Sequence, residues 1–299
     1  MLYPNRLLVF VHIEKAAGMT LNHILRRNFI MRHMEVRQLC QESDGVFRAA
    51  DLKKTFWLNP FIRSISGHSI RVFSDLEDLV PDVRFITLLR DPIKRYISHY
   101  IYIVDWTNKH FPFKKFLSNE VFSNTQTKAI SGFMGVDAAK EYLAKRFWLV
   151  GIVEKFDEFL VLLRKKLKPI KFDPLYTRQN VSWEKVPERK ETAALILEKY
   201  RDEIIERNQL DLQLFQHVHD RILPIQQDDY GSDLQQDLTE FQSALRRCNP
   251  GTRRSYIDYA VRKLYYDPLI GIMRKLNGLP YSRRREAYNI WSLNHYQKT

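Results

Sequence analysis

Apolar and polar residues are arranged along the first 219 residues in blocks that predict strands and helices in turn. Short apolar runs bounded by polar residues predict strands at Leu7–Ile13, Ile62–Ser66, Arg84–Leu89 and Phe147–Val153. Apolar residues at helical spacing predict helices at Thr20–Met31, Ile93–Val104, Phe156–Leu167 and Pro187–Arg207. Such alternation is typical of α/β proteins with a parallel sheet flanked by helices, which is the fold that we predict.

The segment between the first predicted strand and the first helix has the composition of an anion-binding loop. It reads EKAAGMT from Glu14 to Thr20. Backbone N–H groups of such a turn and the helix N-terminus point toward one spot, where Lys15 adds a positive charge. The loop lacks the triphosphate pattern G-x-x-x-x-G-K-[ST], because Lys15 precedes its only glycine, Gly18. A smaller phosphorylated group fits better, although a β–turn–α unit with a chance lysine explains this loop equally well.

A second candidate site follows the third predicted strand. Arg90 stands at the carboxyl end of Arg84–Leu89, Pro92 fits the first turn of the next helix, and Ser98 lies two turns beyond Arg90. A guanidinium offers a planar fork for phosphate oxygens, and a hydroxyl adds another donor. Together these side chains predict a phosphate site. The alternative is that Arg90 forms a surface ion pair and Ser98 has no functional role.

Taken together, the two segments carry a family resemblance. His12–Leu21 reads HIEKAAGMTL and Leu89–Tyr100 reads LRDPIKRYISHY. They resemble H-I-P-K-T-A-G-T-S-L and L-R-D-P-x-x-R-x-x-S-H-Y of the Golgi-type and bacterial carbohydrate sulfotransferases, which include heparan sulfate 2-O-sulfotransferases and chondroitin sulfotransferases. Weaker similarities, in the same order as in that family, occur at Asn124–Lys128, Val150–Asp157 and Asn208–Phe215. The resemblance therefore covers roughly residues 7–219.

The resemblance implies a P-loop-like fold and the donor 3'-phosphoadenosine-5'-phosphosulfate (PAPS), with adenosine 3',5'-bisphosphate as product. Its 5'-phosphosulfate would be held by the first loop, that is by Lys15, Ala16, Ala17, Gly18, Met19 and Thr20. Arg90 and Ser98 would hold its 3'-phosphate. Two anion sites at two strand ends independently suit a ligand with two anionic groups. The chain departs from the family at Glu14, which replaces proline and brings a negative charge beside the anion site unless its side chain turns outward, and at Met19, which replaces threonine and removes one hydroxyl donor.

His68 is the candidate general base for a hydroxyl acceptor. It follows the predicted strand Ile62–Ser66 and precedes a predicted helix at Ser74–Leu79, and Gly67 is expected to allow a sharp turn. Histidine is the side-chain type best suited to proton transfer near neutral pH, and the resembling family places its base at a similar Gly-His pair. The alternative is a turn histidine bonded to backbone. With Lys15 stabilising the leaving phosphate, we expect direct in-line transfer without a metal or a covalent intermediate; His217 and His219 lack a third ligand nearby.

The pattern changes after His219, so the sequence predicts a sulfotransferase domain over residues 1–219 and a helical basic extension over 220–299. Asp220–Asp233 is predicted as a polar linker and Leu234–Arg247 as a helix. Residues 245–299 contain twelve Lys or Arg against three acidic residues, with aromatic residues between them. Such a segment suits anionic glycans or a membrane surface. The alternative is an appendage whose tyrosines pack on the core while its charges are solvated.

Composition narrows the class of protein further. The chain of 299 residues is 44% hydrophobic, has a net charge of +13 and contains only two cysteines, Cys40 and Cys248, so no disulfide framework is expected. Leu7–Ile13 is too short for an anchor, which favours a bacterial cytoplasmic enzyme. We predict a PAPS-dependent sulfotransferase acting on a hydroxyl acceptor, a carbohydrate or glycolipid by family analogy, with no nucleic-acid partner. The alternative is a non-enzymatic binder of acidic polymers; a nucleotide kinase is disfavoured by the missing phosphate-loop pattern.

The segment Phe111–Gly135 is predicted as a loop-and-helix insertion. It contains Asn124, Gln126 and Lys128, whose polar side chains suit contacts with a sugar acceptor. A solvated surface explains them equally well.

Overall fold

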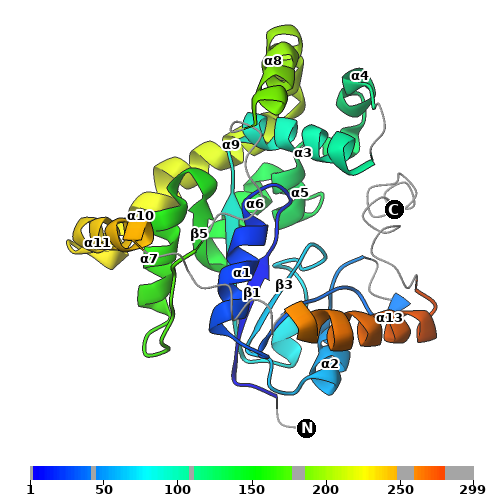
Figure 1. Ribbon diagram of the computed structural model, residues 1–299, viewed down its shortest axis with the longest axis vertical. Helices are drawn as coiled ribbons and strands as arrows, with labels where there is room; N and C mark the ends of the chain where they lie inside the picture. Colours follow the sequence, from blue (N-terminus) through cyan, green and yellow to red (C-terminus); the bar gives the residue numbers. More distant parts are fainter. Residues whose placement is uncertain (1–2, 42–44, 108–110, 177–185, 248–258, 280–299) are drawn as a thin grey trace. The chain divides into compact units, whose positions relative to one another are not determined.

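A computed structural model describes residues 3–41, 45–107, 111–176, 186–247 and 259–279 (Figure 1). Its strands form one five-stranded parallel sheet in the order β2-β3-β1-β4-β5. They are β1 Arg6–Val11, β2 His33–Glu35, β3 Ser64–Gly67, β4 Asp82–Leu89 and β5 Phe147–Ile152. Helices flank the sheet, so the predicted parallel α/β class is confirmed, and the architecture is compatible with a P-loop-like fold.

The four predicted strands all exist, with ends that differ from the prediction by no more than two residues. β1 is buried from Leu7 to Val11, which is typical of a strand covered on both faces of a parallel sheet. Strand β2 was not predicted, because its three residues, His33–Glu35, are too few to show an alternating pattern. In the register of β1 with β3, Val11 pairs with Gly67, so the carboxyl ends of these two strands are level.

The chain divides into two compact units, which we describe separately. Unit 1 comprises Met1–Val11, Leu25–Phe85 and Gly251–Thr299, and unit 2 comprises His12–Ile24 and Ile86–Pro250. Each unit is therefore built from segments that are not contiguous in the sequence. The boundary that the sequence predicted between residues 219 and 220 stays a prediction.

Unit 1 contains helices α2 (Ala49–Leu58) and α13 (Asp267–Leu276), and a π-helical turn, Arg262–Tyr266, leads into α13. The expected helix at Ser74–Leu79 was wrong, since only a 3₁₀ turn, Leu76–Asp78, forms there. Pro81 and the start of β4 at Asp82 leave no room for further helical turns.

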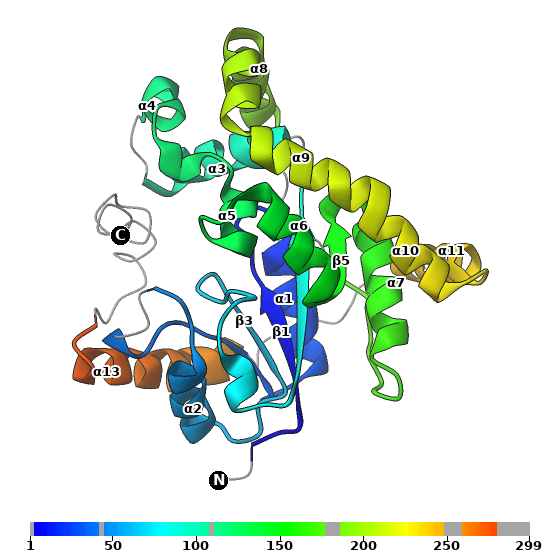
Figure 2. The same cartoon turned by 180° about the vertical axis from the view of Figure 1, so that it is seen from behind.

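The described part of the C-terminal region packs within unit 1 (Figure 2). The Asn59 Nδ2 group donates to the Tyr266 hydroxyl at 2.5 Å, and Arg274, which is 2% exposed, donates to the Gln38 carbonyl. Buried Tyr266 agrees with the appendage alternative, whereas Tyr259 and Tyr265, which are 56% and 47% exposed, do not. Buried Arg274 shows in addition that one of the charges is not solvated. Cys248 and most of the predicted basic segment, including Tyr256, Tyr281, Tyr288 and Trp291, lie outside the described residues.

Unit 2 carries most of the helices. They are α3 (Pro92–Thr107), α4 (Phe113–Leu117), α5 (Thr125–Ser131), α6 (Gly135–Lys145), α7 (Phe156–Lys166), α8 (Pro187–Arg207), α9 (Gln209–His217), α10 (Leu223–Tyr230) and α11 (Leu234–Arg247). Helix α1 (Gly18–Asn28) begins in unit 2 and ends in unit 1. The helices predicted on apolar spacing are confirmed to within three residues at either end, and the insertion Phe111–Gly135 is largely helical.

The predicted linker Asp220–Asp233 was wrong. A π-helical turn, Val218–Ile222, joins α9 directly to α10, and α10 ends only at Gly231, whose φ is 89°. The segment Asp220–Asp233 has few apolar residues, but two of them, Ile222 and Leu223, are buried in a hydrophobic core cluster of unit 2. Pro224 is tolerated because it falls in the first turn of α10. The polar composition of this segment therefore hid the few apolar residues that hold it as a helix against the core.

Candidate anion-binding site

The loop that connects β1 to α1 has an unusual backbone. Lys15 has φ 65° and Ala17 has φ 57°, both in the left-handed region that non-glycine residues rarely enter. Each such residue costs about 1–2 kcal/mol. Left-handed residues that alternate with ordinary ones turn successive N–H groups toward a common concave side, an arrangement that binds anions. The Glu14–Thr20 loop therefore has the backbone of an anion-binding nest.

Some backbone N–H groups of the loop donate to carbonyl oxygens of the protein, and others have no acceptor within the helix. Those of Thr20 and Leu21 donate to the Ala17 carbonyl at 3.0 and 3.2 Å, which closes the first turn of α1. The amides of Gly18 and Met19 belong to that same first turn, where N–H groups have no intrahelical acceptor. The positive end of the helix dipole therefore coincides with the loop.

Gly18 is required by the side chain of His12. A Cβ atom placed on Gly18 would lie far inside van der Waals contact of the His12 imidazole. The ring therefore packs against the start of α1. His12 directly follows β1, so this contact fixes the path of the chain at the beginning of the loop.

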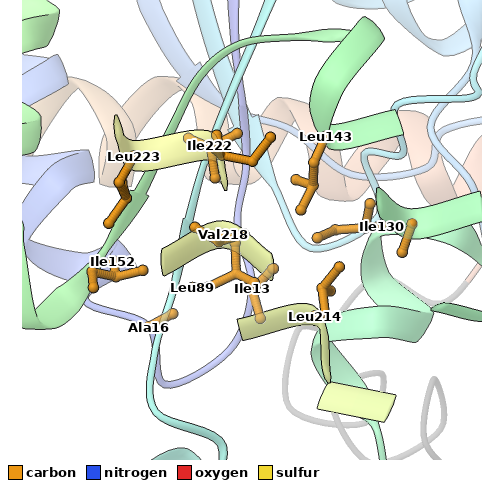
Figure 3. Packing of buried hydrophobic residues seen from close by; sticks show 12 residues of the cluster. Ile13, Ala16, Leu89, Ile130, Leu143, Ile152, Leu214, Val218, Ile222 and Leu223 are labelled. Carbon is orange, nitrogen blue, oxygen red and sulfur yellow. The ribbon is translucent and has the colours of Figure 1, made fainter. Parts of the chain in front are cut away.

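The loop is anchored in the apolar core at the end of β4. Ile13 and Ala16 are 2% and 1% exposed and belong to one cluster with Leu89, Leu214 and Val218 (Figure 3). Because Leu89 immediately precedes Arg90, the same cluster positions both sequence-predicted anion sites.

Arg90 and Lys15 are brought together by this anchoring. The Arg90 Nη1 atom donates to the Lys15 carbonyl oxygen at 3.2 Å, and Arg90 is 8% exposed. The Lys15 ammonium lies 4.3 Å from the centre of the Tyr102 ring on α3. Burial, followed by the positive charge of Arg90, lowers the pKa of Lys15 to about 8. Two cations are thus held close to each other at one loop, a costly arrangement that a bound anion would relieve.

The backbone of Arg90 is held by a side-chain clamp. Its N–H donates to the Gln126 Oε1 atom, and its carbonyl accepts from the Gln126 Nε2 atom, both at 2.9 Å. Gln126 is completely buried, so both readings of Gln126 as a sugar contact or a solvated residue were wrong. Its side chain instead pairs with the N–H and C=O groups of Arg90, as the backbone of a neighbouring strand would, at the carboxyl end of β4.

Behind this clamp lies a fully buried hub around Asp211 of α9. Its carboxylate accepts from the backbone N–H groups of Gln126 and Thr127 and from the Thr127 hydroxyl, at 2.8 to 3.1 Å. The Arg95 Nε atom lies 3.9 Å from the same carboxylate, and both side chains are 0% exposed. Asp211 was not selected from the sequence; the only signal was its place in the weak similarity Asn208–Phe215.

The other polar residues of the insertion are also structural. The Asn124 side-chain oxygen accepts from the amides of Leu210 and Asp211, at 2.9 and 3.1 Å. The Lys128 ammonium donates to the Glu120 carbonyl. The Asn124 contacts fasten the start of α5 to the beginning of α9, and the Lys128 contact fastens α5 to the preceding 3₁₀ turn, Glu120–Phe122.

The Glu14 side chain turns toward α3 rather than outward. Its carboxylate lies 3.3 Å from the His99 Nε2 atom on α3, and His99 is 4% exposed. The loop is therefore tied to α3 at Glu14 as well as at Lys15. A proline, which the resembling family has here, offers no such side-chain contact.

Ser98 and Thr20, the hydroxyl residues of the predicted site, are both largely buried, with 8% and 6% of their surface exposed. Ser98 lies on α3 between Arg95 and Tyr102, in the same unit as the loop. Met19 is 47% exposed. The predicted donor-binding residues thus all fall in unit 2.

His68 belongs to unit 1 and directly follows β3. Its side chain is exposed, and its carbonyl accepts from the Arg71 Nη1 atom at 2.6 Å. The structure corrects the role of Gly67, whose φ is not positive. A Cβ there would lie 2.6 Å from the Val36 carbonyl oxygen, so Gly67 allows close packing rather than a left-handed turn.

Three further observations concern the described residues outside the loop. In the part of the chain that the structure describes, no three His, Cys, Asp or Glu side chains are grouped as metal ligands. An open depression of about 530 Å³ occurs elsewhere in unit 2, lined by residues of α7, α10 and α11 such as Glu158, Gln227 and Leu238, and not by the loop. Of the helices in the described ranges, none has the length and apolar content needed to span a bilayer.

Comparison with known proteins adds no assignment: no protein-family model matches the chain, and no curated protein sequence matches it.

Proposed function

We propose that the chain is a sulfotransferase that moves a sulfuryl group from PAPS to a hydroxyl acceptor, a carbohydrate or glycolipid. The observation that carries this proposal is the pairing of Lys15 and Arg90 at one strained, amide-rich loop. Two cations whose charges repel each other, beside a helix N-terminus, suit a ligand with several negative charges. The motif resemblance then selects PAPS among such ligands.

In the proposed reaction the protein positions the groups and stabilises charge. Of the predicted loop Ala16–Thr20, the amides of Gly18 and Met19, which have no intrahelical acceptor, hold the 5'-phosphosulfate together with the Lys15 ammonium, while Arg90 and Ser98 bind the 3'-phosphate. The acceptor oxygen forms a bond to sulfur as the bond from sulfur to the bridging phosphate oxygen breaks. Lys15 stabilises the negative charge that develops on that oxygen, and adenosine 3',5'-bisphosphate leaves.

His68 is proposed as the base that takes the proton of the acceptor hydroxyl. Its exposed imidazole directly follows the carboxyl end of β3, and ligands of open parallel sheets bind at these strand ends. Proton transfer of this kind contributes about 10²- to 10⁴-fold to a rate.

The decisive experiment is calorimetric titration of the protein with adenosine 3',5'-bisphosphate, followed by mass spectrometry of hydroxyl acceptors incubated with isotopically labelled PAPS. We expect binding and label transfer by the wild-type chain, and loss of both in K15M. K128M is the matched control, because Lys128 is also a partly buried lysine of unit 2 whose pKa is lowered by burial. Absence of nucleotide binding by the wild-type protein would refute the proposal.

His68→Ala separates the catalytic from the binding assignment. It should lower turnover about a hundredfold or more while nucleotide affinity stays as in the wild type. Full activity of this variant would exclude His68 as the base without touching the donor assignment.

A further inference from the structure

The helical segment of residues 259–276 in unit 1, which includes α13, carries exposed apolar side chains. The exposed fractions are 81% for Leu264, 47% for Tyr265, 49% for Ile272 and 81% for Leu276. Tyr265, Ile272 and Leu276 are separated by seven and four residues, which places them on one face of a helix. Leu264 directly precedes Tyr265 and is exposed beside this face, and we call the four residues Leu264, Tyr265, Ile272 and Leu276 together the outer face.

The opposite side of the same segment is already used within unit 1. Tyr266, Ile270 and Arg274 are buried, at intervals of four residues. Contacts of Tyr266 with Asn59 and of Asn277 with Lys54 fasten the segment alongside α2, and both views of the molecule show the two helices side by side (Figures 1 and 2). The outer face is therefore not needed to hold the helix in place.

The outer face is flanked by positive charge. The segment from residue 259 to residue 276 has four basic residues. Arg274 is buried on the opposite side and Arg262 pairs with Glu35 at 3.8 Å, whereas Lys263 pairs with Asp267, the one acidic residue of the segment, at 3.2 Å. Lys263 and Lys275 are exposed beside the apolar positions. The sequence continues with three further arginines at residues 283–285. A helix with an apolar stripe and basic flanks is typical of peripheral membrane attachment.

Two exposed aromatic residues, one at the end of α2 and one just beyond it, add to the same chemistry. Trp57 and Phe61 are 73% and 65% exposed and stand on either side, in sequence, of Asn59, the residue that contacts Tyr266. Tryptophan and tyrosine side chains favour the boundary between lipid headgroups and hydrocarbon.

We propose that the outer face binds the surface of a bilayer that contains anionic phospholipid, with its leucines inserted among the lipids and its lysines at the headgroups. A second copy of the chain fits less well, because it would bring lysines of both copies together. An acidic polysaccharide would pair with the lysines but would leave Leu264 and Leu276 in water. The proposal does not depend on the sulfotransferase assignment.

The test is co-sedimentation of the full chain with vesicles of phosphatidylcholine alone or with one-third phosphatidylserine. We expect binding to the mixed vesicles that falls with rising salt, because surface attraction is screened. Changing both Leu264→Gln and Leu276→Gln should weaken it tenfold or more. Changing both Lys263→Gln and Lys275→Gln should weaken it by a similar factor on mixed vesicles only, at roughly fivefold for each lysine.

Leu195→Gln is the matched control, since Leu195 is a leucine of unit 2 that is 61% exposed. It should bind vesicles as the wild type does, and unfolding curves should show that all the variants fold. Three results would overturn the proposal. They are equal vesicle binding by the wild type and the double leucine variant, binding of heparin but not of vesicles, and a dimer in sedimentation that the leucine changes dissociate without any vesicle binding.

Discussion

Arg95 and Lys15 are two cations of unit 2 that differ in the groups that surround their charges. Arg95 is fully buried and lies 3.9 Å from the Asp211 carboxylate, which raises its pKa against the effect of burial. Lys15 lies over the Tyr102 ring, and within the described ranges no carboxylate is at ion-pair distance from its ammonium. Its neighbour Arg90 lowers its pKa further.

The difference distinguishes a structural cation from one suited to a ligand. A buried cation with its own carboxylate stabilises the arrangement of helices around it. A cation that is held beside another cation, on a strained loop, is unfavourable for folding and is expected only where an external anion completes the charge balance. The two sites are also connected, because Gln126 contacts both Asp211 and Arg90.

The largest expected effect is at the hub. Asp211→Asn removes the charge that balances Arg95 in a fully buried site, so the free energy of unfolding should fall by about 3–5 kcal/mol. Chemical denaturation measures this. A loss below 1 kcal/mol would show that Arg95 does not depend on Asp211 and would remove the basis of the comparison.

The loop should respond in the opposite direction. Between pH 8 and 10.5 the folded chain has lost the Lys15 proton that the unfolded chain retains, so the free energy of unfolding rises with pH in this window. Below pH 8 Lys15 is charged in both states, and the full cost of burying that charge, roughly 3 kcal/mol, lowers the stability of the fold. Lys15→Met should therefore stabilise the fold at pH 7 by about 2–3 kcal/mol while abolishing nucleotide binding. Destabilisation in thermal or chemical unfolding would mean that Lys15 is a structural residue.

The connection between hub and loop can be tested with two similar glutamines. Gln126 clamps the backbone of Arg90, and Gln226 of α10 makes the same two hydrogen bonds with the backbone of Val150 in β5, at 2.9 and 2.8 Å. Replacing either by alanine should cost about 1–3 kcal/mol, because two buried backbone groups lose their partners.

Only Gln126→Ala should also weaken binding of adenosine 3',5'-bisphosphate, by tenfold or more, since only this clamp positions Arg90. Calorimetry on both alanine variants, at a temperature where both are folded, measures the difference. Equal affinities would show that the clamp has no role beyond folding.

The smallest effect is a pH dependence of affinity. A bound anion favours protonated Lys15, whose pKa in the free protein is about 8. Nucleotide affinity should be constant from pH 6.5 to 7.5 and should fall above pH 8 by up to about tenfold per pH unit. Titrations in buffers of equal ionic strength measure it, with Lys128→Met as the control that keeps the profile.

The local sequence pattern was sufficient to predict most helices and strands and to select Lys15 and Arg90 as candidate residues. The apolar run Leu7–Val11 and the motif around Arg90 are continuous in sequence, so their conformation follows from neighbouring residues. Sequence reasoning failed where the partner is distant. The helix that runs through Asp220–Tyr230 depends on a few apolar residues whose burial is decided by the rest of unit 2. Glu14 turns inward because His99, on another helix, is there to meet it.

The sequence by itself determined a parallel α/β protein, and it predicted an anion-binding type of loop after the first strand and an arginine after the strand that is β4 in the structure. Only the tertiary structure decided that Lys15 and Arg90 meet, that Gln126 and Asp211 support them, and that Lys15 carries a lowered pKa. The physical reason is that these properties depend on burial and on partners up to 85 positions apart in the chain, which no local pattern encodes.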